Sequence, residues 1–121
     1  MSHLNKVLLL FPLLLLCTSS SPAQTVKVGT HRTATKLQDL CREHAGECLG
    51  YIQGAADGFA FAMAHGWVPT SWKACTPKGV TGNGLVRVFL EFIDNHPEQL
   101  SYSAADVVGN AMAAAYPCPA K

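Results

Sequence analysis

The stretch ECLGYIQGAADGFAFAMAH, residues 47–65, decides the fold class of this 121-residue chain. It contains no proline, and its apolar side chains recur along one side at helical spacing, namely Ile52, Ala55, Phe59 and Met63. This period predicts one long central helix. The other elements are expected to pack against the apolar side of that helix.

Glycines mark the opposite side of this predicted helix. Gly50, Gly54 and Gly58 recur every four residues. Each glycine costs about 1 kcal/mol relative to alanine inside a helix. We therefore expect the backbone of another helix to approach closely along the glycine side and to compensate for this cost.

Three further segments show helical spacing. They are residues 33–44, a segment from residue 85 to the stop at His96 and Pro97, and residues 104–116. Ser103 and Asp106 resemble a capping box at the start of the last one. Residues 66–84 are rich in Gly, Pro, Ser and Thr, which predicts a long loop or a loop with a short helical turn. The pattern predicts an all-α fold, a small up-and-down four-helix bundle with one long loop between helices two and three.

The first 23 residues have the order of a signal peptide. Lys6 precedes an apolar run over residues 7–16, and a small, polar segment then ends at Ala23. We expect cleavage after Ala23, which leaves residues 24–121 as a single domain in the periplasm. The run is about half the roughly 20 residues that span a bilayer, so no stable membrane anchor is expected.

The cysteines predict two disulfides. Of the five, Cys17 lies in the signal segment, and four remain: Cys41, Cys48, Cys75 and Cys118. An even number in a small exported domain indicates two bridges, with three possible connectivities. In an up-and-down bundle, the first two cysteines share one end and the last two share the other. That arrangement pairs Cys41 with Cys48 and Cys75 with Cys118.

Metal binding and catalysis are not expected. Cys41, His44 and Cys48, with His65, have spacing that could bind zinc, but a disulfide is favoured in an oxidising compartment. No cofactor or catalytic residue is expected, because the HExxH, GxSxG and CxxCH motifs are absent from the sequence. Nine basic and eight acidic residues leave no strong field for binding nucleic acid.

Asp57 stands out because it lies in an otherwise apolar helix. A carboxylate in such a place must be paired or reach water. We expect a structural role, in which Asp57 accepts hydrogen bonds from a neighbouring helix end or loop. An envelope enzyme that uses Asp57 with His44 or His65 is a remote alternative.

The long loop holds the candidate partner-binding residues Trp67, Trp72 and Lys73. Tryptophan is enriched at binding hot spots, and a loop pinned by Cys75 would be partly pre-organised. The alternative is that both indoles cap the end of a thin bundle.

Four runs, taken in order, resemble the Rap/Tai family of immunity proteins for type VI secretion amidase effectors. They are CLGYIQGAADG (48–58), CTPKGV (75–80), VRVFLEFIDNHPE (86–98) and AAAYPC (113–118). The resemblance implies an exported, α-helical, disulfide-bonded protein, often dimeric. Such a protein binds a cell-wall amidase and blocks its active-site cleft.

The resemblance also assigns positions. The four cysteines of the mature chain match the disulfide residues of the family, and Gly50, Tyr51, Gly54 and Asp57 match its helix motif, as scaffold positions. Two alternative functions remain. One is an acid-stress chaperone resembling the HdeA-like proteins, in which protonation of histidines and carboxylates would expose apolar surface. The other is a different binding role in the cell envelope.

Overall fold

A computed structural model describes residues 32–120 of the chain, and the expected signal peptide with its cleavage after Ala23 lies outside them. The described part contains four α-helices and two short 3-10 helices. These are α1 (Ala34–Glu43), α2 (Ala45–Ala64), η1 (Thr70–Trp72), α3 (Gly82–Asn95), η2 (Pro97–Gln99) and α4 (Ala104–Ala115). Residues 32–120 form no strand, and the predicted all-α bundle is confirmed.

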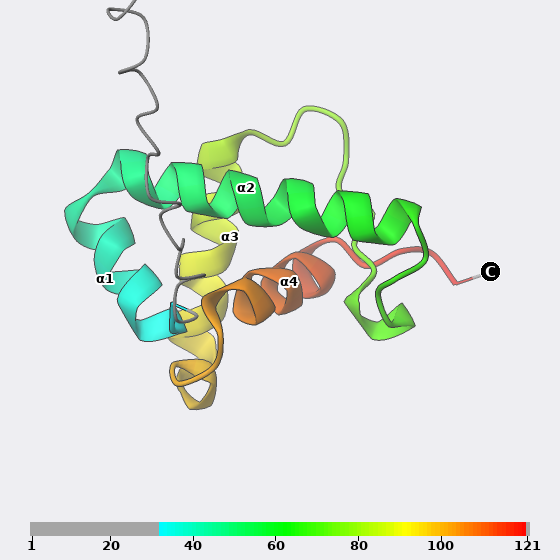
Figure 1. The fold of residues 1–121 in the computed structure, drawn as a ribbon. Helices are drawn as coiled ribbons and strands as arrows, with labels where there is room; N and C mark the ends of the chain where they lie inside the picture. The colour runs from blue at the N-terminus through cyan, green and yellow to red at the C-terminus, as the bar shows by residue number, and fades with distance from the viewer. Residues whose placement is uncertain (1–31, 121) are drawn as a thin grey trace, which may run out of the picture.

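The helix α2 spans the length of the molecule. Figure 1 shows α3 crossing behind α2 at a steep angle, with α1 at the end where α2 begins. The other end of α2 carries η1 and the segment that follows α4. The first part of the loop predicted between the second and third helices therefore lies at one end of the molecule, together with the C-terminal residues, and the rest of the loop runs back to the start of α3.

Side-chain caps account for two of the helix starts. The hydroxyl of Thr33 accepts from the backbone N–H of Lys36 at 3.4 Å, and that of Thr81 accepts from Gly84 at 3.1 Å. The second cap starts α3 at Gly82, before the expected residue 85. Thr81 therefore adds almost one turn to α3.

The capping box expected at Ser103 is wrong. The side chain of Ser103 makes no capping hydrogen bond. The main chain satisfies the start of α4 instead, because the N–H of Ala104 donates to the carbonyl of Arg32 at 2.7 Å. Ser103 also forms an isolated bridge with Thr33. These contacts tie the start of α4 to the residues before α1.

The core is small and entirely apolar. Its largest fully buried side chains are Phe89, Leu37, Ile52, Ile93, Val107, Val108 and Cys48. Each of the four α-helices contributes to it, and no polar or charged side chain is buried among the described residues. A core of this size supports a small domain weakly, which gives covalent links a large share of its stability.

The two disulfides connect as the sequence predicts. Cys41 pairs with Cys48 between the last turn of α1 and the first turn of α2, and Cys75 pairs with Cys118. The second link joins the loop after η1 to the segment after α4. Backbone contacts accompany it, since Ala74 bridges Pro117 and the N–H of Cys75 donates to the carbonyl of Tyr116 at 2.8 Å.

The close helix approach expected along the glycine side of α2 is wrong. A Cβ added at Gly50, Gly54 or Gly58 would meet no atom within 4 Å, and all three glycines are exposed. The apolar side of α2 faces the core, so the glycine side faces solvent. The close approach occurs at Gly109 of α4, where an added Cβ would lie 2.6 Å from Cζ of Phe59.

The substitution Gly109→Ala should lower the free energy of unfolding by about 1–3 kcal/mol, because the Phe59 ring must turn out of its packed position. The matched control is Gly54→Ala, which gains helix propensity and should raise the free energy of unfolding by up to about 1 kcal/mol. Urea unfolding of both variants measures the difference. Equal stability of the two variants would contradict the packing of Phe59 on Gly109.

The two disulfides should contribute unequally to stability, because the loops they close differ in length. The sequence separation is 43 for Cys75 and Cys118, and 7 for Cys41 and Cys48. Loop-closure entropy predicts losses of about 4 and 2.5 kcal/mol when each pair is replaced by serine. Thermal or urea unfolding measures both losses. A larger loss for the shorter loop would contradict this account.

Candidate partner-binding site

The structure places the two candidate tryptophans in different environments. Trp67 is 69% exposed, whereas Trp72 is half-buried and meets the ring of Phe59 edge-on at 5.9 Å. Trp72 therefore holds η1 against α2. The alternative in which both indoles cap the bundle fits Trp72 and does not fit Trp67. Lys73 follows η1 and is exposed.

Trp67 belongs to a cluster of three exposed aromatic rings, which we call the outer aromatic cluster: Phe61, His65 and Trp67. The centroids of Phe61 and His65 lie 4.4 Å apart, and those of His65 and Trp67 lie 4.8 Å apart in a stacked arrangement. Phe61 and Trp67 meet edge-on at 5.5 Å. The indole thus has a fixed place on the surface although it is exposed to solvent.

Local backbone geometry builds this cluster. Phe61 lies on α2 and His65, four residues later, is the C-cap of that helix, so their side chains meet on the same side. Gly66 then adopts a φ of 70°, and its N–H donates to the carbonyl of Met63. The N–H of Trp67 donates to the carbonyl of Ala62 at 2.9 Å. This pair of hydrogen bonds is a Schellman turn, and it returns Trp67 to the last turn of the helix.

The sequence analysis missed Phe61 and His65 as surface residues that join Trp67. A signal was present, since Phe61 lies off the apolar side defined by Ile52, Phe59 and Met63. The dipeptide of Gly66 and Trp67 directly after the helix was a second signal, because glycine commonly ends a helix in this way. The two together predict an aromatic residue folded back on an exposed ring.

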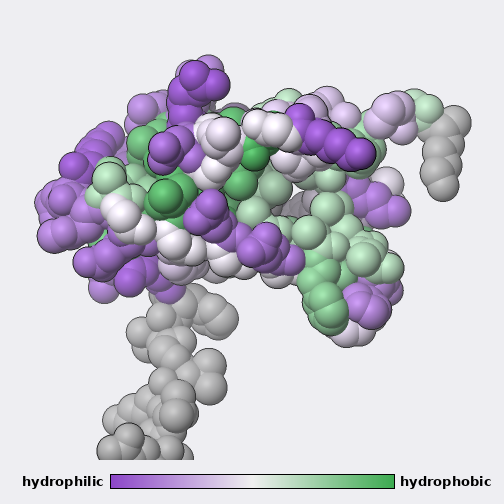
Figure 2. Space-filling view, turned by 90° about the horizontal axis from the view of Figure 1, so that it is seen from above, coloured by the Kyte–Doolittle hydropathy of each residue, from purple (hydrophilic) through white to green (hydrophobic). Residues whose placement is uncertain are grey.

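Large exposed apolar side chains are rare in the described residues. They are Phe61, Trp67 and Tyr102, and the cluster contains two of the three. Figure 2 shows mainly hydrophobic residues gathered in a projecting lobe at the right-hand end of the molecule, the end where α2 terminates. Exposed hydrophobic residues and exposed aromatic rings are both typical of protein-binding sites.

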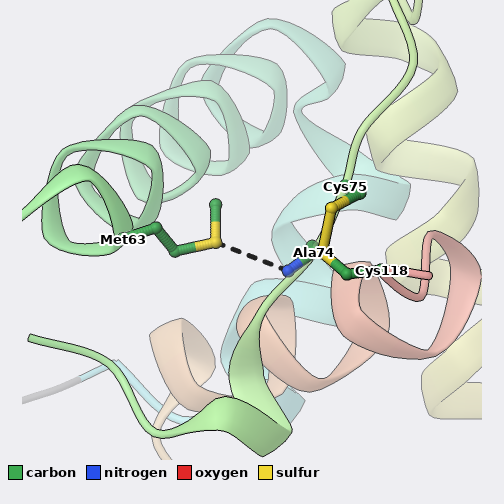
Figure 3. The surroundings of a disulfide bond; sticks show 4 residues. All are labelled: Met63, Ala74, Cys75 and Cys118. Atoms are coloured by element: carbon green, nitrogen blue, oxygen red, sulfur yellow. Dashed lines mark hydrogen bonds between the residues drawn. A yellow bond between two sulfur atoms is a disulfide. The ribbon is translucent and has the colours of Figure 1, made fainter. Parts of the chain in front are cut away.

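Sulfur atoms brace the loop behind this surface. Figure 3 shows the disulfide of Cys75 and Cys118 next to Ala74, whose N–H donates to Sδ of Met63 at 3.4 Å. Met63 lies on α2, so the loop is tied to that helix on one side and to the C-terminal segment on the other. The loop that carries Trp72 and Lys73 is therefore held in place before any partner binds.

The helix motif has no catalytic geometry. Asp57 is exposed, and its carboxylate makes no hydrogen bond or ion pair with any residue of the described chain. The expected acceptance of hydrogen bonds from a neighbouring element is wrong, because this side of α2 faces solvent. The helix rise places the Cα atoms of Asp57 and His65 about 12 Å apart, so they do not form an acid/base pair.

Tyr51 packs against the core and does not act as a base. Its ring lies 5.8 Å from Cζ of Arg32. Burial raises the pKa of the Tyr51 phenol, while the charge of Arg32 lowers it and that of Asp106 raises it. Because the net shift is upward, the phenol stays neutral near pH 7. Gly50 and Gly54, the other motif residues, present open backbone on the exposed side of α2.

The HPE run forms a corner between α3 and α4. The ring of His96 stacks on Phe92 with centroids 4.2 Å apart, and its Nδ1 lies 3.0 Å from Oε1 of Glu98. A hydrogen bond to its own backbone lowers the pKa of Glu98, and the contact with His96 lowers it further. Pro97 starts η2 in between. This motif therefore shapes the chain and has no evident ligand.

The described residues offer neither a metal cluster nor a membrane-spanning helix. Residues 32–120 contain no group of three or more His, Cys, Asp or Glu side chains placed to hold a metal ion. The helices in the same range are also too short or too polar to cross a bilayer.

The acid-stress chaperone alternative needs ionisable groups whose protonation loosens the packing of the core. Every described carboxylate and imidazole lies outside the buried core.

The substitution Asp57→Ala should leave the melting temperature unchanged within about 1 °C, since an exposed residue without partners contributes little to stability. Differential scanning calorimetry at neutral pH measures this. Asp94→Ala is the control, because Asp94 pairs with Arg42 at 3.7 Å and accepts from Gln38 at 3.0 Å. A clear loss of stability in the Asp57 variant would show that Asp57 has the structural role predicted from the sequence.

Comparison with known proteins identifies the family. A family model described as Rap1a immunity proteins matches residues 15–118. Comparison with curated proteins and with solved structures gave no match. The matched region contains both disulfides, all four α-helices and the outer aromatic cluster. The match covers most of the chain and confirms the resemblance drawn from its motifs: the chain belongs to the family of Rap1a immunity proteins.

Proposed function

We propose that this immunity protein works in the periplasm, where it binds a peptidoglycan amidase effector of type VI secretion and blocks the active-site cleft of that amidase. Membership of the immunity family supports a toxin as the partner. The two disulfides support an oxidising compartment. Inhibition of this kind needs a complementary surface and no chemistry in the inhibitor itself.

The observation that carries the proposal is the outer aromatic cluster. Its members contact one another and are exposed, with Phe61 at 57% and Trp67 at 69%. Aromatic side chains of this kind supply most of the binding energy at many protein interfaces. Because contacts between the three rings already restrict their side-chain rotamers, these side chains lose little conformational entropy on binding.

The shape of the surface fits the proposed mode of inhibition. The hydrophobic lobe in Figure 2 projects from the molecule, and an amidase presents its catalytic residues in a cleft. A projecting hydrophobic surface is suited to fill such a cleft and exclude substrate. In this arrangement Phe61, His65 and Trp67 contact the amidase, while Trp72 packs on Phe59 and holds η1 against α2.

Co-expression with amidase effectors tests the proposal. The effector encoded next to this protein, and effectors from related bacteria, are directed to the periplasm of a bacterial host with and without the immunity protein. The proposal predicts that one effector lyses cells alone, is neutralised by the immunity protein, and co-purifies with it. If none of these amidases is bound or neutralised, the proposed function is wrong.

The substitution Trp67→Ala should weaken the complex by roughly thirtyfold, about 2 kcal/mol, because it removes the most exposed ring of the cluster. Isothermal titration calorimetry with the purified amidase measures the change. Tyr102→Ala is the matched control, since Tyr102 is 52% exposed but lies at the start of α4, outside the cluster. Equal affinities of the two variants would show that the amidase does not bind at the cluster.

A further inference from the structure

A pocket of about 520 Å³ lies between η1 and the segment that follows α4. Thr70, Ser71 and Lys73 form one wall. The other wall is formed by Ala113, Pro117, Cys118, Pro119 and Ala120. The volume falls within the range of ordinary ligand sites and is large enough for an amino acid side chain with its flanking backbone.

The side chains of the η1 wall offer hydrogen-bond donors and one positive charge. Among the described residues, the hydroxyls of Thr70 and Ser71 have no hydrogen-bond partner, and no carboxylate lies within 4 Å of the Lys73 ammonium group. No acidic residue lines the pocket. Thr70, Ser71 and Lys73 are exposed, and a ligand with oxygen acceptors and a negative charge complements all three side chains.

The opposite wall is apolar and selects the rest of the ligand. Pro117 and Pro119 have no backbone N–H, and the remaining lining side chains there are alanines and a disulfide sulfur. A wall of this kind packs against methylene groups. The two walls together fit a carboxylate on a short aliphatic stem, which is the side chain of aspartate or glutamate.

The two walls are held together before any ligand enters. The disulfide of Cys75 and Cys118 joins them covalently, and the N–H of Cys75 donates to Tyr116 at 2.8 Å. Within η1, the N–H of Lys73 donates to the carbonyl of Thr70 at 3.2 Å. A pocket fixed in this way binds its ligand with a small entropic cost.

We propose that this pocket binds the carboxylate of an aspartate or glutamate side chain on the toxin that the protein neutralises. The inference rests on the proposed function for the identity of the partner. It also rests on position, because η1, the C-terminal segment and the end of α2 lie at the same end of the molecule (Figure 1). A toxin docked on the outer aromatic cluster has the pocket within the reach of a standard interface.

A small-molecule titration tests the pocket itself. The disulfide-bonded protein is titrated with N-acetyl-glutamate N-methylamide while its backbone amides are followed by NMR, and the glutamine analogue is the uncharged control. We expect saturable shifts at Thr70, Ser71, Lys73, Ala113 and Cys118 with the glutamate probe only. The absence of shifts, or equal shifts with the glutamine analogue, would overturn the carboxylate assignment.

A third probe separates a protein carboxylate from a cell-wall fragment. A stem peptide containing γ-D-glutamate and diaminopimelate also carries carboxylates. Weaker binding of this peptide than of the glutamate probe supports the proposal. Saturation by the stem peptide at a tenfold lower concentration would assign the pocket to a wall fragment and overturn the proposal.

Lys73→Gln should lower the affinity for the amidase about tenfold, since it removes the charge that pairs with the carboxylate. Lys78→Gln is the matched control, because Lys78 is exposed in the same loop and does not line the pocket. If the Lys73 variant binds the amidase as tightly as the unaltered protein, the inference about the pocket is wrong and the proposed function still stands. If the unaltered protein binds no amidase, the proposed function is wrong, and the toxin is not the ligand of the pocket.

Discussion

The disulfide between Cys75 and Cys118 joins two segments that otherwise meet mainly through two backbone contacts, the bridge of Ala74 with Pro117 and the hydrogen bond of Cys75 with Tyr116. One follows η1 in the long loop and the other follows α4, and the buried side chains nearest to them in the described sequence are Ala74, Ala111 and Met112. The contact of Ala74 with Sδ of Met63 then connects the joined segments to α2. The pocket depends on this connection, whereas the outer aromatic cluster is formed by the local turn at Gly66. A preformed binding surface is thus obtained from a domain with a thin core.

The helix α2 serves the core and the surface at once. Ile52 faces the core and is fully buried, while Gly50, Gly54 and Gly58 lie on the exposed side. The same helix ends in Phe61 and His65, which receive Trp67 through the Schellman turn. One helix therefore fixes the position of the exposed rings relative to the core. A surface fixed in this way suits an immunity protein that binds another protein by shape.

Apolar periodicity was enough to predict four helices within a few residues and, through them, the pairing of the cysteines. It could not predict the surroundings of the glycine side of α2, because a period defines which side is apolar and says nothing about what covers the other side. For the same reason the hydrogen-bond partners predicted for Asp57 are not found among residues 32–120. The cluster was missed because it depends on the backbone turn at Gly66, which brings Trp67 back to Phe61. The pocket joins residues more than 40 positions apart and has no local sequence signal.

The central claim is that a braced end of the molecule, formed by the end of α2, η1 and the C-terminal segment, contacts the toxin. Hydrogen exchange measured by mass spectrometry on the free protein and on its complex with the amidase tests this claim most directly. The account predicts that binding slows exchange in residues 61–74 and 113–120 and leaves α1 unchanged. Slower exchange confined to α1 and α3, with none at the braced end, would contradict it.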